Sequence, residues 1–265
     1  MPGPTQITPA QLSRLIGTPD MPALIDVRID DDFGADQRVI PTARRVAHSQ
    51  ITTIVPDLQG RRVVVICQRG QKLSEGAAAL LRCHGVQAET LEGGFEAWQA
   101  NALPLVPVVI LEGTARWVTR HRPKIDRIAC AWLIRRFIDP KSEFLFVPPS
   151  EVSGVASRFS AIPFDCEGGF WSHRGEGCTL DTMIAEFGLA SPAPDRLALV
   201  VRAADTNRHD LAPEAAGFLA ISVGLSRAYK DDLMQMEAGI LLYDALYRWA
   251  RDGFEEGHDW PGGRA

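Results

Sequence analysis

The chain has 265 residues, which is long for one average domain and suits two domains that each bury a hydrophobic core. Its 46% apolar and 23% charged residues are typical of a globular protein and exclude the collagen-like, coiled-coil and largely disordered classes. Residues 1–110 hold 10 basic and 11 acidic side chains and the remainder hold 18 and 22, so neither half has the basic balance of a nucleic-acid-binding protein.

The N-terminal segment MPGPTQITPAQLSRLIG lacks a basic stretch followed by an apolar core, and no run of about eighteen apolar residues occurs. This pattern argues against secretion and against a membrane partner. The five cysteines form neither a disulfide ladder nor a CxxC metal motif, and they lie at positions 67, 83, 130, 166 and 178. A reducing compartment, and therefore the cytoplasm, is the expected location.

Two short apolar segments in the first half have the pattern of buried strands. Residues 23–27 and 62–66 are rich in β-branched side chains and end at polar or glycine residues. Residues 74–84 are predicted to form a helix that begins with Ser74 as its N-cap and stops at Gly85. Strands that alternate with helices predict an α/β first domain with a mostly parallel sheet flanked by helices.

The strongest chemical signal is Cys67, which follows a predicted strand and precedes a predicted helix. This arrangement directs the backbone N–H groups of residues 68–72 at the sulfur and places the positive end of the helix nearby, which favours a nucleophilic thiolate. A small buried hydrophobic cysteine is the alternative. The predicted catalytic residues are Cys67, Arg69 and Lys72, and the predicted substrate-binding residues are Gln68, Gly70, Gln71, Leu73 and Ser74.

Four motifs over about 85 residues make the first half resemble the rhodanese family. Residues 24–28 (LIDVR) are similar to the family's Asp-Val-Arg strand, and residues 40–43 (IPTA) to its IPGA turn. Residues 67–72 are similar to its six-residue active loop, and residues 91–94 (LEGG) with Trp98 to its closing element. The motifs occur in the family's order, and together they are highly specific.

The resemblance implies a sulfurtransferase that needs no cofactor. The Cys67 thiolate would take a sulfane sulfur from a small donor such as thiosulfate, form a persulfide, and pass the sulfur to a thiol or cyanide-like acceptor. Lys72 and Leu73 stand where many members have arginine and a hydroxyl residue, which puts the preference for thiosulfate in doubt because lysine lacks the bidentate fork of arginine. Leucine at 73 also disfavours the related phosphatase loop, which carries arginine there.

The regular pattern breaks over residues 101–113 (NALPLVPVVILEG), and we place the domain boundary there, with domains at 1–108 and 114–255. The second domain is predicted to be mainly α-helical. Residues 126–137 have helical spacing. A second amphipathic helix of about twenty residues, with apolar side chains at helical spacing from Leu233 to Tyr247, is predicted to share its core. Residues 160–178 are rich in glycine and short polar residues, which predicts loops or short strands.

Two groups of polar residues in the second half raise functional alternatives. The stretch from Arg116 to Arg136 holds six arginines, one lysine and a single acid, Asp126, so it forms either a solvated helix face or an anion-binding surface. A divalent metal is a possible cofactor, although ordinary surface residues explain the same pattern; the candidate ligands are Asp165, Glu167, His173, Asp205 and His209. Cys166 and Cys178 flank this region as candidate sulfur acceptors, or as inert buried thiols.

From Trp117 onward, about 130 residues resemble the C-terminal domain of the chromate resistance protein ChrB family. The resemblance rests on residues 117–120 (WVTR), 122–138 (RPKIDRIACAWLIRRFI), 172–175 (SHRG), 203–206 (AADT) and 210–214 (DLAPE), with Cys178 and Thr179. It implies a role in chromate resistance or its regulation. Regulators of that family carry a different N-terminal region, which argues against DNA binding here.

The two halves together predict a sulfurtransferase linked to chromate or oxyanion resistance. The alternative is a non-catalytic oxyanion-sensing or regulatory binding protein, in which the arginine-rich stretch binds an oxyanion and the Cys67 loop only binds anions.

Overall fold

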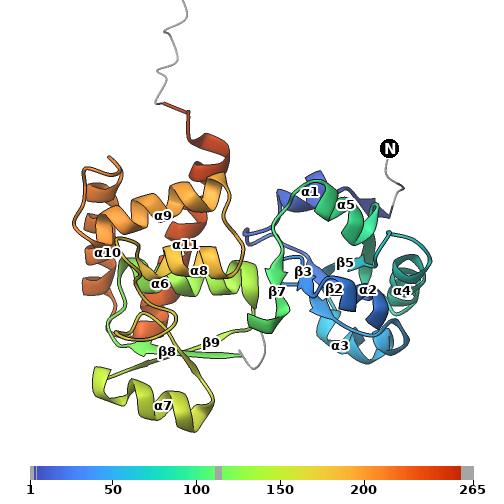
Figure 1. The fold of residues 1–265 in the computed structure, drawn as a ribbon, viewed down its shortest axis with the longest axis horizontal. Coiled ribbons are helices and arrows are strands. Elements are labelled where there is room, and N and C mark those ends of the chain that lie inside the picture. Colours follow the sequence, from blue (N-terminus) through green and yellow to red (C-terminus); the bar gives the residue numbers. More distant parts are fainter. Residues whose placement is uncertain (1–2, 4, 111–114, 258–265) are drawn as a thin grey trace, which may run out of the picture.

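The computed structural model describes residues 3, 5–110 and 115–257. Two lobes lie side by side, one built around a central sheet and the other rich in helices (Figure 1). No helix within the described residues has the length and hydrophobicity needed to span a membrane.

The first lobe contains a five-stranded sheet in which all neighbouring strands are parallel, in the order β1-β6-β5-β2-β4. Its strands are β1 (Gln6–Ile7), β2 (Ala23–Asp26), β4 (Arg44–Arg45), β5 (Arg62–Ile66) and β6 (Gln87–Leu91). A two-stranded antiparallel pair lies beside it, formed by β3 (Arg38–Val39) and β7 (Val106–Pro107). The helices are α1 (Pro9–Ser13), α2 (Asp30–Ala35), η1 (His48–Ile54), α3 (Val55–Leu58), α4 (Lys72–Cys83), α5 (Gly94–Ala100) and η2 (Val108–Ile110).

Successive side chains of the central strands point to opposite faces of this sheet, and both faces are buried. On β5, Val63 and Val65 belong to a core with η1, α3 and α4, whereas Val64 and Ile66 belong to a core with α1 and α5. Strands buried on both sides require continuous apolar runs, which explains the sequence VVVI. The α/β fold predicted for this half is confirmed.

The second lobe combines a small parallel sheet with a helix bundle. Its strand order is β10-β8-β9, and the strands are β8 (Arg116–Arg120), β9 (Glu143–Val147) and β10 (Ile162–Pro163). The helices are α6 (Ile125–Leu133), η3 (Ile134–Ile138), η4 (Pro149–Glu151), α7 (Val152–Phe159), α8 (Thr179–Glu186), α9 (Pro192–Asp205), α10 (Ala215–Ala228), α11 (Asp232–Arg248) and η5 (Trp249–Gly253). The predicted helix-rich character is confirmed, and strand β8 inside the arginine-rich stretch is an addition to it.

The predicted common core of α6 and α11 is also confirmed. Trp132 of α6 lies 5.4 Å from Tyr247 between ring centroids, and its Nε1 donates to Asp244 of α11 at 2.9 Å. Arg136 makes two hydrogen bonds with the same carboxylate, at 2.8 and 2.7 Å. One carboxylate therefore fixes the register of both helices through charge-assisted bonds.

The two lobes share one continuous hydrophobic cluster, which runs from Leu12 and Trp98 in the first lobe to Phe137 and Tyr247 in the second. Gly17 sits at the contact with φ of +77°, and a Cβ there would lie 2.4 Å from the Phe137 ring. Residues 111–114 of the predicted boundary segment lie outside the described residues. Residue 1 of the predicted first domain does so as well. The shared core means that the lobes are packed against one another rather than tethered.

Candidate functional site

Cys67 lies directly after β5, at the carboxyl end of the parallel sheet, and its side chain is buried with 4% of its surface exposed. The sulfur points into the loop that leads to α4. The Gln71 N–H donates to Sγ at 3.3 Å, and the Ser74 hydroxyl lies 3.1 Å from it. Among the described residues, Gln71 alone donates an amide hydrogen bond to the sulfur, whereas the sequence predicts a ring of amides from residues 68–72.

The helix after the loop begins earlier than predicted. Residue Lys72 opens α4 and Gln71 is the N-cap, so the prediction of Ser74 as N-cap is wrong. Ser74 lies fully buried in the first turn, where its hydroxyl donates to the Gln71 carbonyl at 3.1 Å and faces the Cys67 sulfur. A hydroxyl that approaches the sulfur is therefore supplied from one position further along the chain than in many rhodaneses.

The Cys67 loop is held in place by the start of α5, at the end of the LEGG segment. The N–H groups of Phe95 and Glu96 in α5 donate to the carbonyls of Cys67 and Gln68, both at 3.0 Å. Because a trans peptide directs its N–H opposite to its C=O, these bonds turn the Gln68 and Arg69 amides away from α5. A Cβ on Gly94 would lie 2.3 Å from the Cys67 carbonyl oxygen, so only glycine permits this approach.

Gly70 fulfils the predicted role of closing the loop tightly. Its φ is +65°, and a Cβ there would lie 2.5 Å from the Leu91 carbonyl oxygen and 2.8 Å from the Gly93 nitrogen. Leu73 packs against the same apolar cluster as Cys67. The loop conformation is therefore fixed by contacts that no larger residue at position 70 would allow.

The predicted cationic residues stand at the surface of the loop. Arg69 has 70% of its side chain exposed and pairs with Glu96 at 3.3 Å, and Gln68 also donates to Glu96. Lys72 is exposed at the start of α4. Any anion approaching Cys67 therefore meets these two cations, one of them already balanced by a carboxylate.

The Asp-Val-Arg signature has a structural role. Arg28 is 1% exposed, bonds Asp26 at 2.8 Å, and donates to the carbonyls of Asp36 and Arg38. Its guanidinium stacks 3.7 Å from the Phe95 ring of α5. Arg28 therefore anchors the helix whose N–H groups hold the Cys67 loop.

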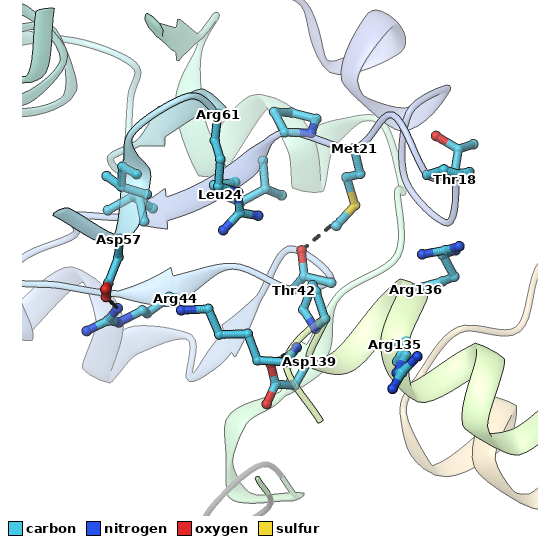
Figure 2. Close-up of a pocket in the computed structure, with 17 residues that line it drawn as sticks. Thr18, Met21, Leu24, Thr42, Arg44, Asp57, Arg61, Arg135, Arg136 and Asp139 are labelled. Atoms are coloured by element: carbon cyan, nitrogen blue, oxygen red, sulfur yellow. Dashed lines mark hydrogen bonds and ion pairs between the residues drawn. The ribbon is translucent and has the colours of Figure 1, made fainter. Parts of the chain in front are cut away.

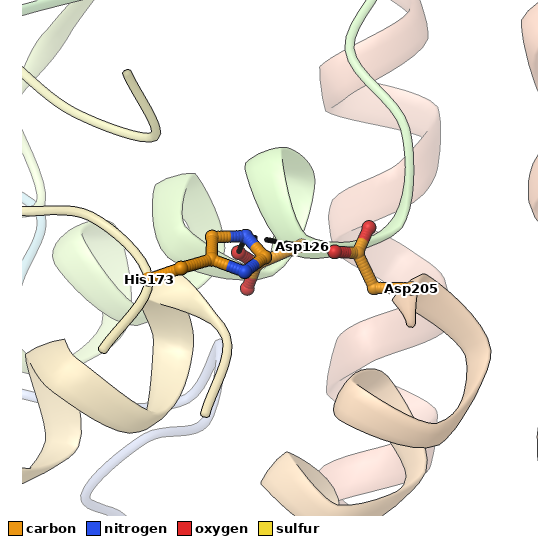
Figure 3. A group of neighbouring side chains, drawn as sticks. All are labelled: Asp126, His173 and Asp205. Carbon is orange, nitrogen blue, oxygen red and sulfur yellow. Dashed lines mark ion pairs between the residues drawn. The ribbon is translucent and has the colours of Figure 1, made fainter. Parts of the chain in front are cut away.

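A second cluster lies in the helix-rich lobe, where three segments far apart in the sequence converge (Figure 3). Asp126 comes from the first turn of α6, Asp205 from the end of α9, and His173 from the loop before α8. His173 Nε2 lies 3.4 Å from Asp126, 3.5 Å from Asp165 and 3.6 Å from Asp205, in each case to a carboxylate oxygen.

Hydrogen bonds orient two of these carboxylates. The two oxygens of Asp126, which is 1% exposed, accept from the backbone N–H groups of Thr179 and Leu180 at 2.8 and 3.0 Å. Asp165 accepts from Arg127 at 2.8 Å, from Arg120 at 3.2 Å and from the Thr179 hydroxyl at 3.1 Å. The start of α8 thus serves as the scaffold of the cluster, and Asp165 is already neutralised by two arginines.

The electrostatics of the cluster follow from this crowding. The interaction with the neighbouring Asp126 carboxylate raises the pKa of His173 to about 9. Burial, together with the charges of Asp126 and Asp165, raises the pKa of Asp205 to about 6. Burial opposes ionisation of Asp126, but its interaction with His173 and its hydrogen bonds from the backbone outweigh burial and hold its pKa below the ordinary value.

Of the five predicted metal ligands, the structure brings three together, namely Asp165, His173 and Asp205. Glu167 and His209 are exposed and are not in the group of side chains whose ligand atoms converge. The sequence analysis missed Asp126 as a ligand. Its signal was its place as the single acid in an arginine-rich stretch, at the start of a helix.

Most arginines of the arginine-rich stretch are bonded to other elements of the lobe. Its arginines bind acidic side chains or carbonyls of other elements: Arg116 with Glu143, Arg120 and Arg127 with Asp165, Arg122 with Ser226 and Tyr229, Arg135 with Glu237, and Arg136 with Asp244. These bonds connect β8 and α6 to the rest of the lobe, so most of this positive charge serves the fold.

A cavity of about 230 Å³ lies between the lobes (Figure 2). Five cationic and two acidic side chains are among its lining residues: Arg44, Arg61, Arg135, Arg136 and Lys141, with Asp57 and Asp139. Within the described part of the chain, Arg61 and Lys141 form no ion pair, whereas Arg44 pairs with Asp57 at 3.1 Å. The cavity therefore has a positive balance.

The cysteines of the second lobe differ from Cys67. Cys130 and Cys178 are fully buried, and burial raises the pKa of both thiols well above the ordinary value. Cys166 is partly buried and its thiol lies 3.2 Å from the Phe164 carbonyl oxygen; burial raises its pKa as well. These environments favour inert thiols over sulfur acceptors.

Comparison with known proteins gives two domain matches. Residues 8–101 match the rhodanese-like domain, and residues 117–250 match the C-terminal domain of ChrB. Protein ChrB of Cupriavidus metallidurans is 37% identical over 134 residues, which cover 50% of this chain and 40% of that protein. The chain thus matches less than half of that relative's length.

Solved structures resemble the first lobe. The thiosulfate sulfurtransferase of Pseudomonas aeruginosa is 28% identical with a TM-score of 0.33, over 39% of this chain and 19% of its own. A rhodanese-related protein of Thermoplasma volcanium is 24% identical with a TM-score of 0.34, over 38% of this chain and 96% of its own.

Proposed function

Because this chain belongs to the ChrB C-terminal domain family and carries a rhodanese-like domain ahead of that domain, we propose that it is a sulfurtransferase acting in chromate or oxyanion resistance. The observation that carries the proposal is the position of the Cys67 sulfur, which lies at the carboxyl end of β5 and accepts the Gln71 N–H at 3.3 Å. A sulfur held by an amide at the start of a helix is favoured as an anion.

The reaction would proceed in two displacements. The Cys67 thiolate attacks the outer sulfur of a donor such as thiosulfate, a new sulfur–sulfur bond forms, and sulfite leaves with the electron pair of the broken bond. A nucleophilic acceptor, a thiolate or cyanide, then attacks the terminal sulfur of the persulfide and releases the Cys67 thiolate. The Gln71 N–H, 3.3 Å from the sulfur, would stabilise the anion before and after each step, and the Ser74 hydroxyl, 3.1 Å from the sulfur, would do so by turning its hydrogen away from the Gln71 carbonyl.

The loop offers an anionic donor two exposed cations, Arg69 and Lys72. Neither presents the bidentate fork typical of rhodanese loops at the fifth position, because Lys72 stands there and Arg69 is held by Glu96 at 3.3 Å. We therefore expect thiosulfate to be a donor with a high KM.

The test is the cyanide-dependent release of thiocyanate from thiosulfate by the full chain, with detection of one added sulfur atom on Cys67 by mass spectrometry. We expect Cys67→Ser to fall to the blank rate. Cys83→Ser, which removes an exposed cysteine at the end of α4, serves as the matched control and should retain full activity. Retained turnover in Cys67→Ser would refute the proposal.

The cavity between the lobes supports a second candidate function, the binding of an oxyanion. Its volume of about 230 Å³ accommodates a tetrahedral dianion, and Arg61 and Lys141 are two lining cations without an ion-pair partner among the described residues. Calorimetric titration with chromate and with sulfate tests it. We expect Lys141→Met to weaken binding about 3- to 10-fold, since an exposed charge contributes on the order of 1 kcal/mol. Lys230→Met, at another exposed lysine, should bind as the wild type does.

A further inference from the structure

We propose that Asp126, His173 and Asp205 bind a divalent first-row transition-metal ion in the second lobe. Each of these residues offers one ligand atom, and the three atoms lie within 4.8 Å of one another. The residues come from α6, from the loop before α8 and from α9, so the fold, and not a local run of acids, brings them together (Figure 3).

The separations between the ligand atoms support a metal more than a set of hydrogen bonds. The distances of 3.4 Å to Asp126 and 3.6 Å to Asp205 from His173 Nε2 exceed the usual range for an N–H···O bond, which is about 2.7–3.2 Å. Two ligands bound about 2.1 Å from a tetrahedral ion are separated by roughly 3.4 Å. The three side chains therefore surround a space that an ion would fill with little movement.

The cluster also has the surroundings that metal ligands need. Backbone N–H groups of Thr179 and Leu180 fix the Asp126 carboxylate, in the way that outer hydrogen bonds orient ligands in metalloproteins. Asp165 Oδ1 lies 3.5 Å from His173 Nε2, but this oxygen accepts from the Thr179 hydroxyl, and Arg120 and Arg127 bind the other oxygen, so we assign Asp165 to the outer shell.

The ion would remain accessible from solvent. The His173 side chain is 42% exposed and that of Asp205 is 26% exposed, while Asp126 is buried at the base of the cluster. Asp205 lines one cavity of the lobe and His173 lines another. Three protein ligands with an open side are typical of sites that keep a position for water or substrate.

The donor set indicates the class of ion. Imidazole favours zinc, iron, nickel and copper, whereas carboxylates favour manganese, magnesium and calcium. One imidazole with two carboxylates is the mixed set that suits Zn²⁺, Fe²⁺ or Mn²⁺. The probes are therefore Zn²⁺ and Mn²⁺, with Mg²⁺ as the comparison.

The test is titration of the chelator-treated full chain with Zn²⁺ by calorimetry and with Mn²⁺ by electron paramagnetic resonance. We expect one Zn²⁺ or Mn²⁺ ion per chain, bound at least 10-fold more tightly than Mg²⁺, and a loss of affinity of at least 10- to 100-fold in His173→Ala and Asp205→Asn. His209→Ala, which removes an exposed histidine outside the cluster, should change the affinity less than 2-fold.

The proposal is overturned if the wild type binds neither ion at 100 µM, or if His173→Ala binds as tightly as His209→Ala. Asp205→Asn keeps the size and polarity of the side chain, so it tests the site even if His173→Ala folds poorly. Circular dichroism of each variant reports folding. Because metal binding is measured without sulfur transfer, failure here leaves the Cys67 proposal untouched, and the converse also holds.

Discussion

The Cys67 loop and the His173 cluster have opposite electrostatic character. At Cys67, the Gln71 N–H and the Ser74 hydroxyl contact the sulfur and two exposed cations belong to the same loop, which suits an anion. At His173, three carboxylates surround one imidazole, which suits a cation. The comparison teaches that a site for an anion can be assembled within one short loop, from an amide and neighbouring side chains. A site for a cation needs several acidic side chains, which the fold here gathers from distant segments.

The reactivity of the cysteines offers the sharpest contrast between the two regions. Burial raises the pKa of Cys130 and Cys178, so almost none of either thiol is ionised at pH 8. We expect iodoacetamide to modify Cys67 and the exposed Cys83 more than about 100-fold faster than these two, since one unit of pKa changes the thiolate fraction tenfold. Peptide mass spectrometry over a time course measures the rates.

Prior incubation with a sulfane donor provides the control, because a persulfide on Cys67 changes the mass of its alkylated peptide and leaves the Cys83 peptide unchanged. Equal rates of labelling of Cys178 and Cys67 in folded protein would contradict the expected difference in thiol reactivity between the two regions.

The next largest effect is expected from a substitution of Gly94, which lies against the Cys67 loop. In Gly94→Ala the added Cβ would lie 2.3 Å from the Cys67 carbonyl oxygen and 2.4 Å from the Gly70 nitrogen, at a φ of +60°. We expect sulfur transfer to fall about 100-fold, because small displacements of reacting groups have effects of that order, and the free energy of unfolding to fall by about 1–3 kcal/mol. Thiocyanate assays and urea denaturation measure the two quantities.

Gly76→Ala is the matched control, since Gly76 lies in α4 with open space around it. That substitution should leave sulfur transfer intact and stabilise the protein by up to about 1 kcal/mol. Metal affinity at the His173 cluster should be the same in both variants. A Gly94→Ala protein with normal activity would show that the loop does not depend on contact with α5.

The same contrast explains how much of each site could be predicted from the sequence. The Cys67 loop was predictable because strand, loop and helix start are consecutive, and β5 was predicted to the residue. The error at Ser74 arose because a serine near a helix start is usually a cap, and tertiary contact with Cys67 overrides that preference.

The His173 cluster was predictable only in part. Asp126 looked like an ordinary acid in the first turn of a helix, and its role depends on the start of α8 more than fifty residues later, which no local pattern reveals. Glu167 lies in the same glycine-rich stretch as Asp165, yet it is exposed whereas Asp165 is buried. In the same way, the arginine-rich stretch gave no sign that its partners were Asp165, Glu237 and Asp244.

The smallest predicted effect concerns the choice of donor at the Cys67 loop. Lys72→Arg places a bidentate fork at the start of α4, where the exposed side chain can meet the sulfonate oxygens of thiosulfate. We expect kcat/KM for thiosulfate to rise about 3- to 10-fold through a lower KM, and Lys72→Met to lower it by a similar factor. Arg69→Gln should change it less, because Glu96 already balances Arg69. Steady-state kinetics with an uncharged sulfane donor provide the control, since the charge at position 72 acts on the sulfonate. If Lys72→Met slows both donors equally, the side chain supports the loop and does not recognise the anion.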